Sequence, residues 1–231
     1  MAAGWLIKES SHHFFTEKCV VCNTKLLHKE RGVCIQCLYD LPRTNNFMTP
    51  DNESEILLAG RFPFMRVAAF SMFTTKGLLQ VLIHELKYNQ KPYIGELIGN
   101  IYGEDLSKSS FIETVDVIVP VPLHPKKKAL RGYNQAEAFA KGISISTSIP
   151  FSVDQLVRIV HNPTQTKLSK TQRWENVNGI FDVKDKSAFE DKHVLLVDDV
   201  ITTGSTIEAC AKALLKCANV TISVAAIGEA F

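Results

Sequence analysis

One stretch of this 231-residue chain, residues 194–206 (VLLVDDVITTGST), limits its possible folds more than any other. The four leading apolar residues are typical of a strand that is buried on both faces of a parallel sheet. Asp198 and Asp199 follow at the carboxyl end of this strand, which is where open α/β sheets bind their ligands. Behind them, Gly204 and the start of a helix allow backbone N–H groups to converge on an anion. The stretch therefore predicts a phosphate-binding loop beside an acidic pair.

The loop and the acidic pair together indicate the kind of ligand. Carboxylates accept hydrogen bonds from sugar hydroxyls, and the loop can hold a phosphate on the same sugar. The chain has neither the Gly-x-x-x-x-Gly-Lys-Ser/Thr pattern of P-loops nor the Gly-x-Gly-x-x-Gly fingerprint of dinucleotide sites. We therefore expect a ribose phosphate rather than ATP or NAD. The alternative is an ordinary strand, turn and helix with Ser/Thr helix caps.

Apolar runs of two kinds alternate along the chain. Short β-branched runs predict strands at residues 66–73, 115–121, 156–160, 193–200 and 220–227. Longer runs with helical spacing predict helices at residues 76–88, 93–106, 134–143 and 207–217. This alternation predicts an α/β fold in which helices flank a parallel sheet.

The length of the chain exceeds that of a typical single domain, so we expect one main domain with an appendage. Residues 44–55 (TNNFMTPDNESE) are polar and rich in turn formers, which is typical of a connecting segment. We therefore divide the chain into an N-terminal module at residues 1–45, a linker at residues 46–60 and a main domain at residues 61–231.

Four of the six cysteines form two C-x-x-C pairs in the N-terminal module, namely Cys19, Cys22, Cys34 and Cys37. This spacing lets four thiolates surround one Zn²⁺ ion tetrahedrally, and the metal supplies folding energy that so small a segment lacks. We therefore expect a structural zinc site. The alternative is a pair of redox dithiols or disulfides.

The charge of the chain is unevenly distributed. The formal net charge of +2 argues against a histone-like coat protein. Between His124 and Arg173, however, nine Lys or Arg residues stand against two acids, so this segment carries +7. Such a concentration favours an anionic partner, either a diphosphate or a nucleic-acid backbone. For the lysines at 126–128, an ordinary solvated surface is an equally good explanation.

The first residues do not form a secretory signal, because Lys8 and Glu9 follow a very short apolar run. No later stretch approaches membrane-spanning length. We therefore expect a cytoplasmic protein without membrane insertion. Disulfides are rare in that reducing compartment, which favours metal binding by the cysteines.

Residues 194–206 resemble, over their whole length, the phosphoribosyl-pyrophosphate (PRPP) binding motif of type I phosphoribosyltransferases. The resemblance implies that Asp198 and Asp199 contact the ribose 2′- and 3′-hydroxyls. It also implies that the 5′-phosphate is held by Thr202, Thr203, Gly204, Ser205 and Thr206. The expected fold is then a type I phosphoribosyltransferase-like parallel sheet flanked by helices, with a small N-terminal four-cysteine zinc module.

Further motifs resemble the ComF competence-protein branch of the same superfamily. They are PVPLHP at 120–125, RGYNQ at 131–135, and the spaced residues Gln165, Leu168, Arg173, Asn176 and Val177. The resemblance implies a pyrophosphate-binding loop made of Val121, Pro122, Leu123, His124 and Lys126. If the chain is catalytic, the expected catalytic residues are Asp198, Asp199, Arg131 and Arg173. Mg²⁺ bound with PRPP, together with basic side chains, would neutralise the departing pyrophosphate.

The ComF resemblance implies a PRPP-binding protein that acts in DNA uptake during natural transformation. Its implied partners are PRPP, single-stranded DNA and other competence proteins. Two alternatives stay open, namely an active phosphoribosyltransferase of nucleotide or amine metabolism without a DNA role, and a PRPP sensor without turnover. Few aromatic residues lie among the basic ones, so base stacking has little support.

Overall fold

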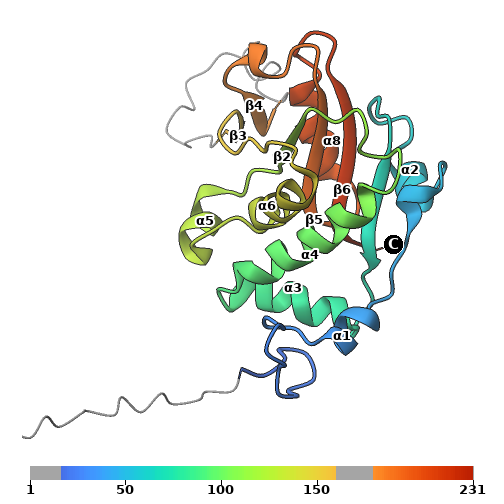
Figure 1. Cartoon of the computed structure of the whole chain (residues 1–231). Helices are drawn as coiled ribbons and strands as arrows, with labels where there is room; N and C mark the ends of the chain where they lie inside the picture. The colour runs from blue at the N-terminus through green and yellow to red at the C-terminus, as the bar shows by residue number, and fades with distance from the viewer. Residues whose placement is uncertain (1–16, 160–178, 231) are drawn as a thin grey trace, which may run out of the picture.

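The computed structural model describes residues 17–159 and 179–230. Their centre is a sheet of four parallel strands in the order β1 (Val67–Met72), β6 (Thr221–Glu229), β5 (His193–Ile201) and β2 (Val117–Pro120) (Figure 1). These strands agree with the predicted ranges to within two residues at either end. None of the helices in the described ranges is long and apolar enough to cross a membrane.

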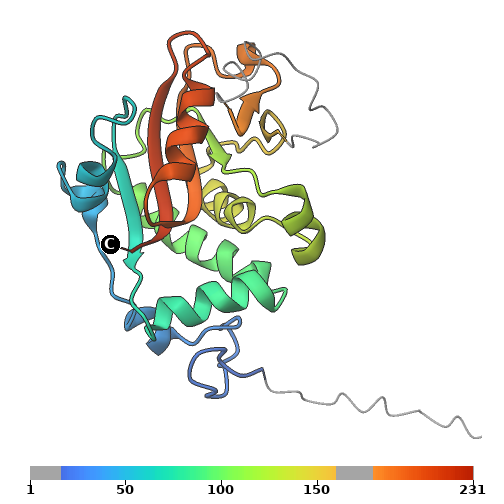
Figure 2. The ribbon, with the colours of Figure 1, turned by 180° about the vertical axis from the view of Figure 1, so that it is seen from behind.

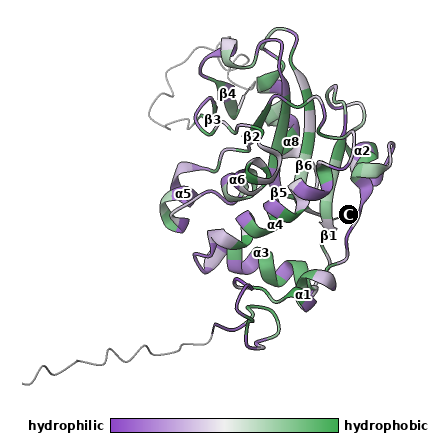
Figure 3. Ribbon diagram, viewed as in Figure 1, coloured by the Kyte–Doolittle hydropathy of each residue, from purple (hydrophilic) through white to green (hydrophobic). Residues whose placement is uncertain are grey.

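Helices cover both faces of this sheet. On one face lie α3 (Leu78–Tyr88), α4 (Pro92–Leu106) and α6 (Gln135–Thr147), and on the other lies α8 (Ser205–Leu214) (Figure 2). The central strands are mostly hydrophobic because each face has its own core cluster (Figure 3). In β5, Leu195 and Val197 pack with α3, α4 and α6, whereas Val194 and Leu196 pack with α8. The predicted parallel sheet flanked by helices is confirmed.

The strand predicted at residues 156–160 does not join this sheet. It forms β3 (Leu156–Arg158), which pairs in antiparallel register with β4 (Phe181–Val183), a strand that we did not predict. The side chains of Leu156, Phe181 and Val183 are buried in the cluster on the α8 side. The short helix η3 (Lys186–Ala188) then leads into β5.

The N-terminal module packs on the main domain. It contains the short helix α1 (Ile35–Tyr39), and the buried side chains of Val33 and Cys34 belong to the same core cluster as α3 and α4. The Arg31 guanidinium lies 5.5 Å from the centre of the Tyr93 ring at the start of α4. The module and the main domain therefore share one hydrophobic core.

Residues 46–60, which we expected to be a linker, form η1 (Asn46–Met48) and α2 (Glu53–Leu58) beside β1. The Asn52 side chain begins α2 by accepting a hydrogen bond from Glu55 N at 3.1 Å. Phe47 and Leu58 are buried, and Asn46 Nδ2 donates to the Glu229 carboxylate at 3.0 Å. This polar stretch is packed because its few apolar side chains reach the core.

The basic stretch after β2, where we predicted no helix, contains the short helix α5 (Pro125–Arg131). Pro125 suits the first helical position, since its missing N–H has no partner there in any case. His124 caps this end, because its Nδ1 accepts a hydrogen bond from Lys126 N at 3.2 Å. The helix ends at Gly132, which has a φ of +80°. No side chain of α5 is buried.

Candidate functional site

The acidic pair lies on a part of β5 that continues past the end of its neighbour β2. β2 ends at Pro120 opposite Val197, whereas β5 runs on through both acids. The chain after β2 stays close to β5, because Val121 N donates to Val197 O at 2.8 Å. Asp198 and Asp199 therefore border the space beyond the carboxyl end of β2, where parallel sheets bind ligands.

The two acids face opposite sides of the sheet, because side chains alternate along a strand. The Asp199 side chain lies on the same face of the sheet as those of Leu195 and Val197, which face α3, α4 and α6. The Asp198 side chain lies on the same face as that of Leu196, which faces α8. A ligand that contacts both acids must therefore lie at the edge of the sheet rather than on one of its faces.

The acidic pair has one basic neighbour, Lys87, which the sequence patterns did not indicate. Lys87 lies on the last turn of α3, and its Nζ is 2.9 Å from Asp199 Oδ2. Asp198 Oδ1 accepts a hydrogen bond from Asp199 N at 2.8 Å. Burial and the charge of Asp199 raise the pKa of Asp198 to about 8, while Lys87 acts in the opposite direction. Burial therefore works against the charge of Asp198, whereas Asp199 has a basic partner in Lys87.

The loop between β5 and α8 has the geometry of an anion site. Gly204 has a φ of +73° and directly precedes the first turn of α8. The unpaired N–H groups and the dipole of a helix start attract an anion. The hydroxyl side chains around the glycine are exposed, namely Thr202, Thr203, Ser205 and Thr206. The structure thus brings the predicted phosphate loop to the end of the strand that carries the acidic pair.

Two residues in and just after the expected linker support this loop. A Cβ atom at Gly204 would lie 2.3 Å from Leu58 Cδ2, so any other residue would force this buried side chain of α2 to shift. The Arg61 guanidinium donates to the Thr203 carbonyl and lies 3.8 Å from the Glu208 carboxylate. No local motif could reveal these contacts, because they join positions far apart in the chain.

The predicted pyrophosphate loop leaves the sheet beside the acidic pair. Of its residues, Val121 is buried, those at 122–124 are half-buried, and Lys126 is exposed on α5. Asn134 Nδ2 donates to the Val121 carbonyl at 3.0 Å, and the same side chain caps α6. The loop is therefore held between β5 and the start of α6.

The RGYNQ motif connects α5 and α6 to the end of α3. Arg131 donates to Gln135 Oε1 at 2.7 Å, and its guanidinium lies 5.5 Å from the centre of the Tyr88 ring. The Tyr133 hydroxyl donates to the Leu86 carbonyl. The motif thus joins the carboxyl end of α3 to the segment that follows β2.

Arg173 lies outside the described residues, as do Gln165, Leu168, Asn176 and Val177. Its expected role toward pyrophosphate, together with Arg131, stays a prediction.

The four N-terminal cysteines form a candidate metal site. Their Sγ atoms all lie within 4.8 Å of one another, and Cys22 is the exposed member. The backbone N–H groups of Cys34 and Cys37 donate to the sulfurs of Cys19 and Cys34, at 3.4 and 3.5 Å. Hydrogen bonds with Thr24 lower the pKa of Cys22 to about 6, which favours the thiolate that binds metals. Four sulfur ligands this close together fit one metal ion.

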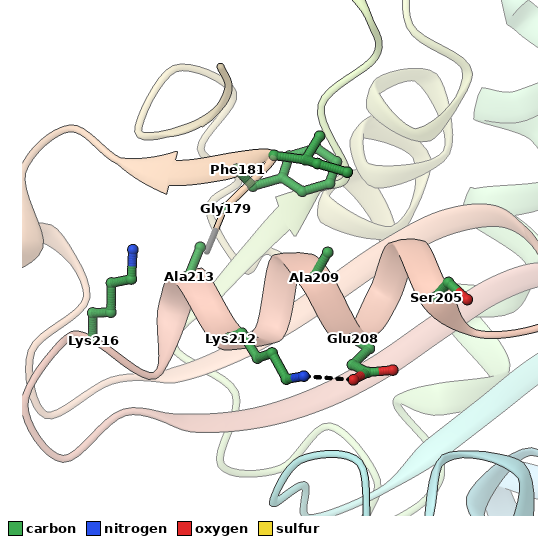
Figure 4. Close-up of a pocket in the computed structure, with 9 residues that line it drawn as sticks. Gly179, Phe181, Ser205, Glu208, Ala209, Lys212, Ala213 and Lys216 are labelled. Atoms are coloured by element: carbon green, nitrogen blue, oxygen red, sulfur yellow. Dashed lines mark hydrogen bonds and ion pairs between the residues drawn. The ribbon is translucent and has the colours of Figure 1, made fainter. Parts of the chain in front are cut away.

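A cavity of about 450 Å³ lies between α8 and β4 (Figure 4). Ser205 and Ala209 line it along the helix, and Phe181 lines it from β4. Lys212 and Glu208 form an ion pair at 2.6 Å at its border. The cavity meets the phosphate loop only at Ser205, so it is separate from the acidic pair.

Comparisons with known proteins agree with this geometry. The phosphoribosyl transferase domain family matches residues 132–227. Competence protein F of Haemophilus influenzae is 32% identical over 142 residues, which are 60% of this chain and 62% of that protein. DNA utilization protein YhgH of Salmonella typhimurium is 26% identical over 209 residues, which are 89% of this chain and 87% of that protein. Together with the domain match, these relatives support a ComF-family phosphoribosyltransferase-like protein.

The ComF resemblance predicted from the motifs is thereby confirmed. The alignment covers less than two thirds of competence protein F. A solved allosteric regulatory enzyme of purine biosynthesis aligns over 61% of this chain and 29% of its own chain, with 20% identity and a TM-score of 0.43.

Proposed function

We propose that this ComF-family chain binds PRPP and acts in DNA uptake during natural transformation. One observation carries PRPP binding, namely that an acidic pair, a left-handed glycine and a helix start follow one another beyond the end of β2. The names of two relatives, competence protein F and DNA utilization protein YhgH, support the role in DNA uptake.

Each part of PRPP has its own proposed binding residues. Asp198 and Asp199 accept hydrogen bonds from the ribose hydroxyls, and residues 202–206 hold the 5′-phosphate. The pyrophosphate lies against the loop at 121–124 and the nearby Lys126. If Mg²⁺ is bound with the pyrophosphate, it would neutralise part of its charge.

The same site suits a transfer reaction in which the bond between ribose C1 and pyrophosphate breaks with oxocarbenium character, while the acceptor amine or base forms the new bond to C1. Arg131 and Arg173 are proposed to stabilise the departing pyrophosphate, while the acidic pair orients the ribose. Pyrophosphate release in the presence of nucleobases, amines or DNA identifies an active transferase. PRPP binding without release identifies a sensor.

Asp198→Asn combined with Asp199→Asn tests the PRPP site. We expect PRPP affinity with Mg²⁺, measured by calorimetry, to fall at least about 100-fold, because hydrogen bonds to charged groups contribute about 1.5–3 kcal/mol each. The matched control is Asp182→Asn, which removes a carboxylate on β4 that lies 3.6 Å from the Lys216 ammonium and should leave the affinity unchanged. Unchanged PRPP affinity in the double variant, with an intact fold, would mean that the site is wrongly assigned.

We further propose that the four clustered cysteines bind a structural Zn²⁺ ion and that the protein works in the cytoplasm. Zinc suits the site because four thiolates satisfy its tetrahedral preference, and a reducing compartment keeps the thiols available. Single-stranded DNA and other competence proteins are the proposed partners beyond PRPP.

A further inference from the structure

The carboxyl end of α3 contacts both sides of the proposed PRPP site. Lys87 Nζ lies 2.9 Å from Asp199 Oδ2 on β5. The preceding carbonyl, that of Leu86, accepts a hydrogen bond from the Tyr133 hydroxyl in the RGYNQ motif. Because the Leu86 side chain is fully buried, the core holds this turn of α3 in place. The Lys87 side chain therefore extends to Asp199 from a helical turn that the core holds in place.

The Lys87–Asp199 ion pair differs from an ordinary surface pair. The side chains of Lys87 and Asp199 are only 22% and 17% exposed, and a second acid, Asp198, directly precedes Asp199 on the strand. Two acids at this degree of burial repel each other unless a cation balances one of them. In residues 17–159 and 179–230, no other basic side chain forms an ion pair with either acid.

We propose that Lys87 is a positioning residue that holds the Asp199 carboxylate in place to accept hydrogen bonds from a ribose and balances the negative charge of the acidic pair. The inference rests on the proposed function, because PRPP supplies that ribose. A carboxylate is an acceptor at both oxygens, whereas a protonated carboxyl group turns one of them into a donor. Lys87 acts through Asp199 and needs no contact with the ligand.

This role predicts a pH dependence of PRPP binding. Burial first, and the charge of Asp199 second, raise the pKa of Asp198 to about 8, while Lys87 opposes this increase. On α8, burial and the charge of Asp198 raise the pKa of the Cys210 thiol well above its usual value, and Arg158 of β3 opposes that effect. Since raising the pH removes the proton from the acidic pair, PRPP affinity should increase as the pH passes through the pKa of Asp198.

Lys87→Met keeps most of the side-chain stem and removes the charge. We expect the pH midpoint of PRPP affinity to move up by about one unit, so that affinity at neutral pH falls about tenfold and recovers at high pH. Lys87→Arg keeps the charge and should stay within about threefold of the unaltered chain at every pH. The matched control is Lys91→Met, which breaks a half-buried ion pair with Glu85 (2.6 Å) and should leave the profile unchanged.

An unchanged pH profile in Lys87→Met overturns the proposal, and so does a loss of equal size at every pH, which indicates a merely structural role. A second measurement needs no PRPP. Carboxyl ¹³C titration of the ligand-free protein should show that Lys87→Met raises the pKa of Asp198 further, and an unchanged titration also overturns the proposal. If the unaltered chain fails to bind PRPP, the proposed function is wrong, while this titration still decides whether Lys87 controls the acidic pair.

Discussion

At the scale of single residues, Gly204 joins the phosphate loop to a helix far away in the sequence. Its φ of +73° is unfavourable for any residue with a Cβ atom, and this atom would lie 2.3 Å from Leu58 Cδ2 of α2. Gly60 has a similar φ of +76°, but its Cβ position has no atom within 4 Å. Comparing these two glycines separates the cost of the backbone conformation from the cost of the contact.

Gly204→Ala should lower the free energy of unfolding by about 2–4 kcal/mol, because the backbone conformation and the contact with Leu58 both oppose the new methyl group. Gly60→Ala should lower it by only about 1 kcal/mol. Urea unfolding measures both changes, and calorimetry should show weaker PRPP binding for Gly204→Ala alone. Equal losses of stability would show that the contact with Leu58 does not constrain the loop.

At the scale of secondary-structure elements, α5 places basic side chains beside the proposed pyrophosphate loop. The helix buries none of its side chains and depends on its caps, with His124 at one end and Gly132 at the other. Lys126 and Lys127 are exposed, and Lys128 lies 3.3 Å from Glu137 on α6. The helix therefore presents its lysines to solvent without using them in the core.

Changing Lys126, Lys127 and Lys128 to Ala should weaken single-stranded DNA binding and reduce its salt dependence. The slope of log affinity against log salt should fall by up to about 2, since each phosphate contact on a single strand contributes about 0.7. Binding measured at several salt concentrations gives this slope.

The matched control for α5 changes three exposed lysines near the amino end of β5, Lys184, Lys186 and Lys192, to Ala. This control variant alters the net charge by the same amount, but near the amino end of β5 rather than after the carboxyl end of β2, where α5 lies. If both triple variants reduce the salt slope equally, DNA binding depends on total charge and α5 has no special part in it.

At the scale of the whole molecule, the cysteine module is part of the main core rather than an appendage on a tether. Cys19, Cys34 and Cys37 are buried in the cluster that contains α3 and α4. A Cβ atom at Gly32 would lie 2.2 Å from the Tyr93 ring, which shows how closely the module approaches α4. Loss of a metal should therefore affect the stability of the whole chain.

Cys22→Ser tests this coupling, because Cys22 is the exposed member of the cluster and its replacement leaves the core packing intact. We expect elemental analysis to show a fall from about one zinc per chain to nearly none, and the thermal midpoint to fall by several degrees. Hydrogen exchange should increase in residues 17–45. Cys217→Ser, outside the cluster, should keep its zinc, and a full zinc content in Cys22→Ser would contradict the assignment.

The strands β5 and β6 could be predicted because a continuous apolar run already shows burial on both faces, and the cysteine cluster because its spacing is local. The packing of residues 46–60 could not be predicted from the sequence. This polar stretch contains few apolar side chains, and it forms η1 and α2 only when a core is present for those side chains to pack against. Likewise α5 depends on caps at His124 and Gly132 rather than on an apolar pattern.

By itself, the sequence predicted the α/β fold, and it placed a glycine loop at residues 202–206 directly after two acids, because each feature depends on residues that are neighbours along the chain. Only the tertiary structure decided that Lys87 balances Asp199 and that Leu58 and Arg61 support the loop. It also decided that the acids face opposite sides of the sheet beyond the end of β2. These arrangements join residues that are distant along the chain, and such contacts form only when strands and helices pack together.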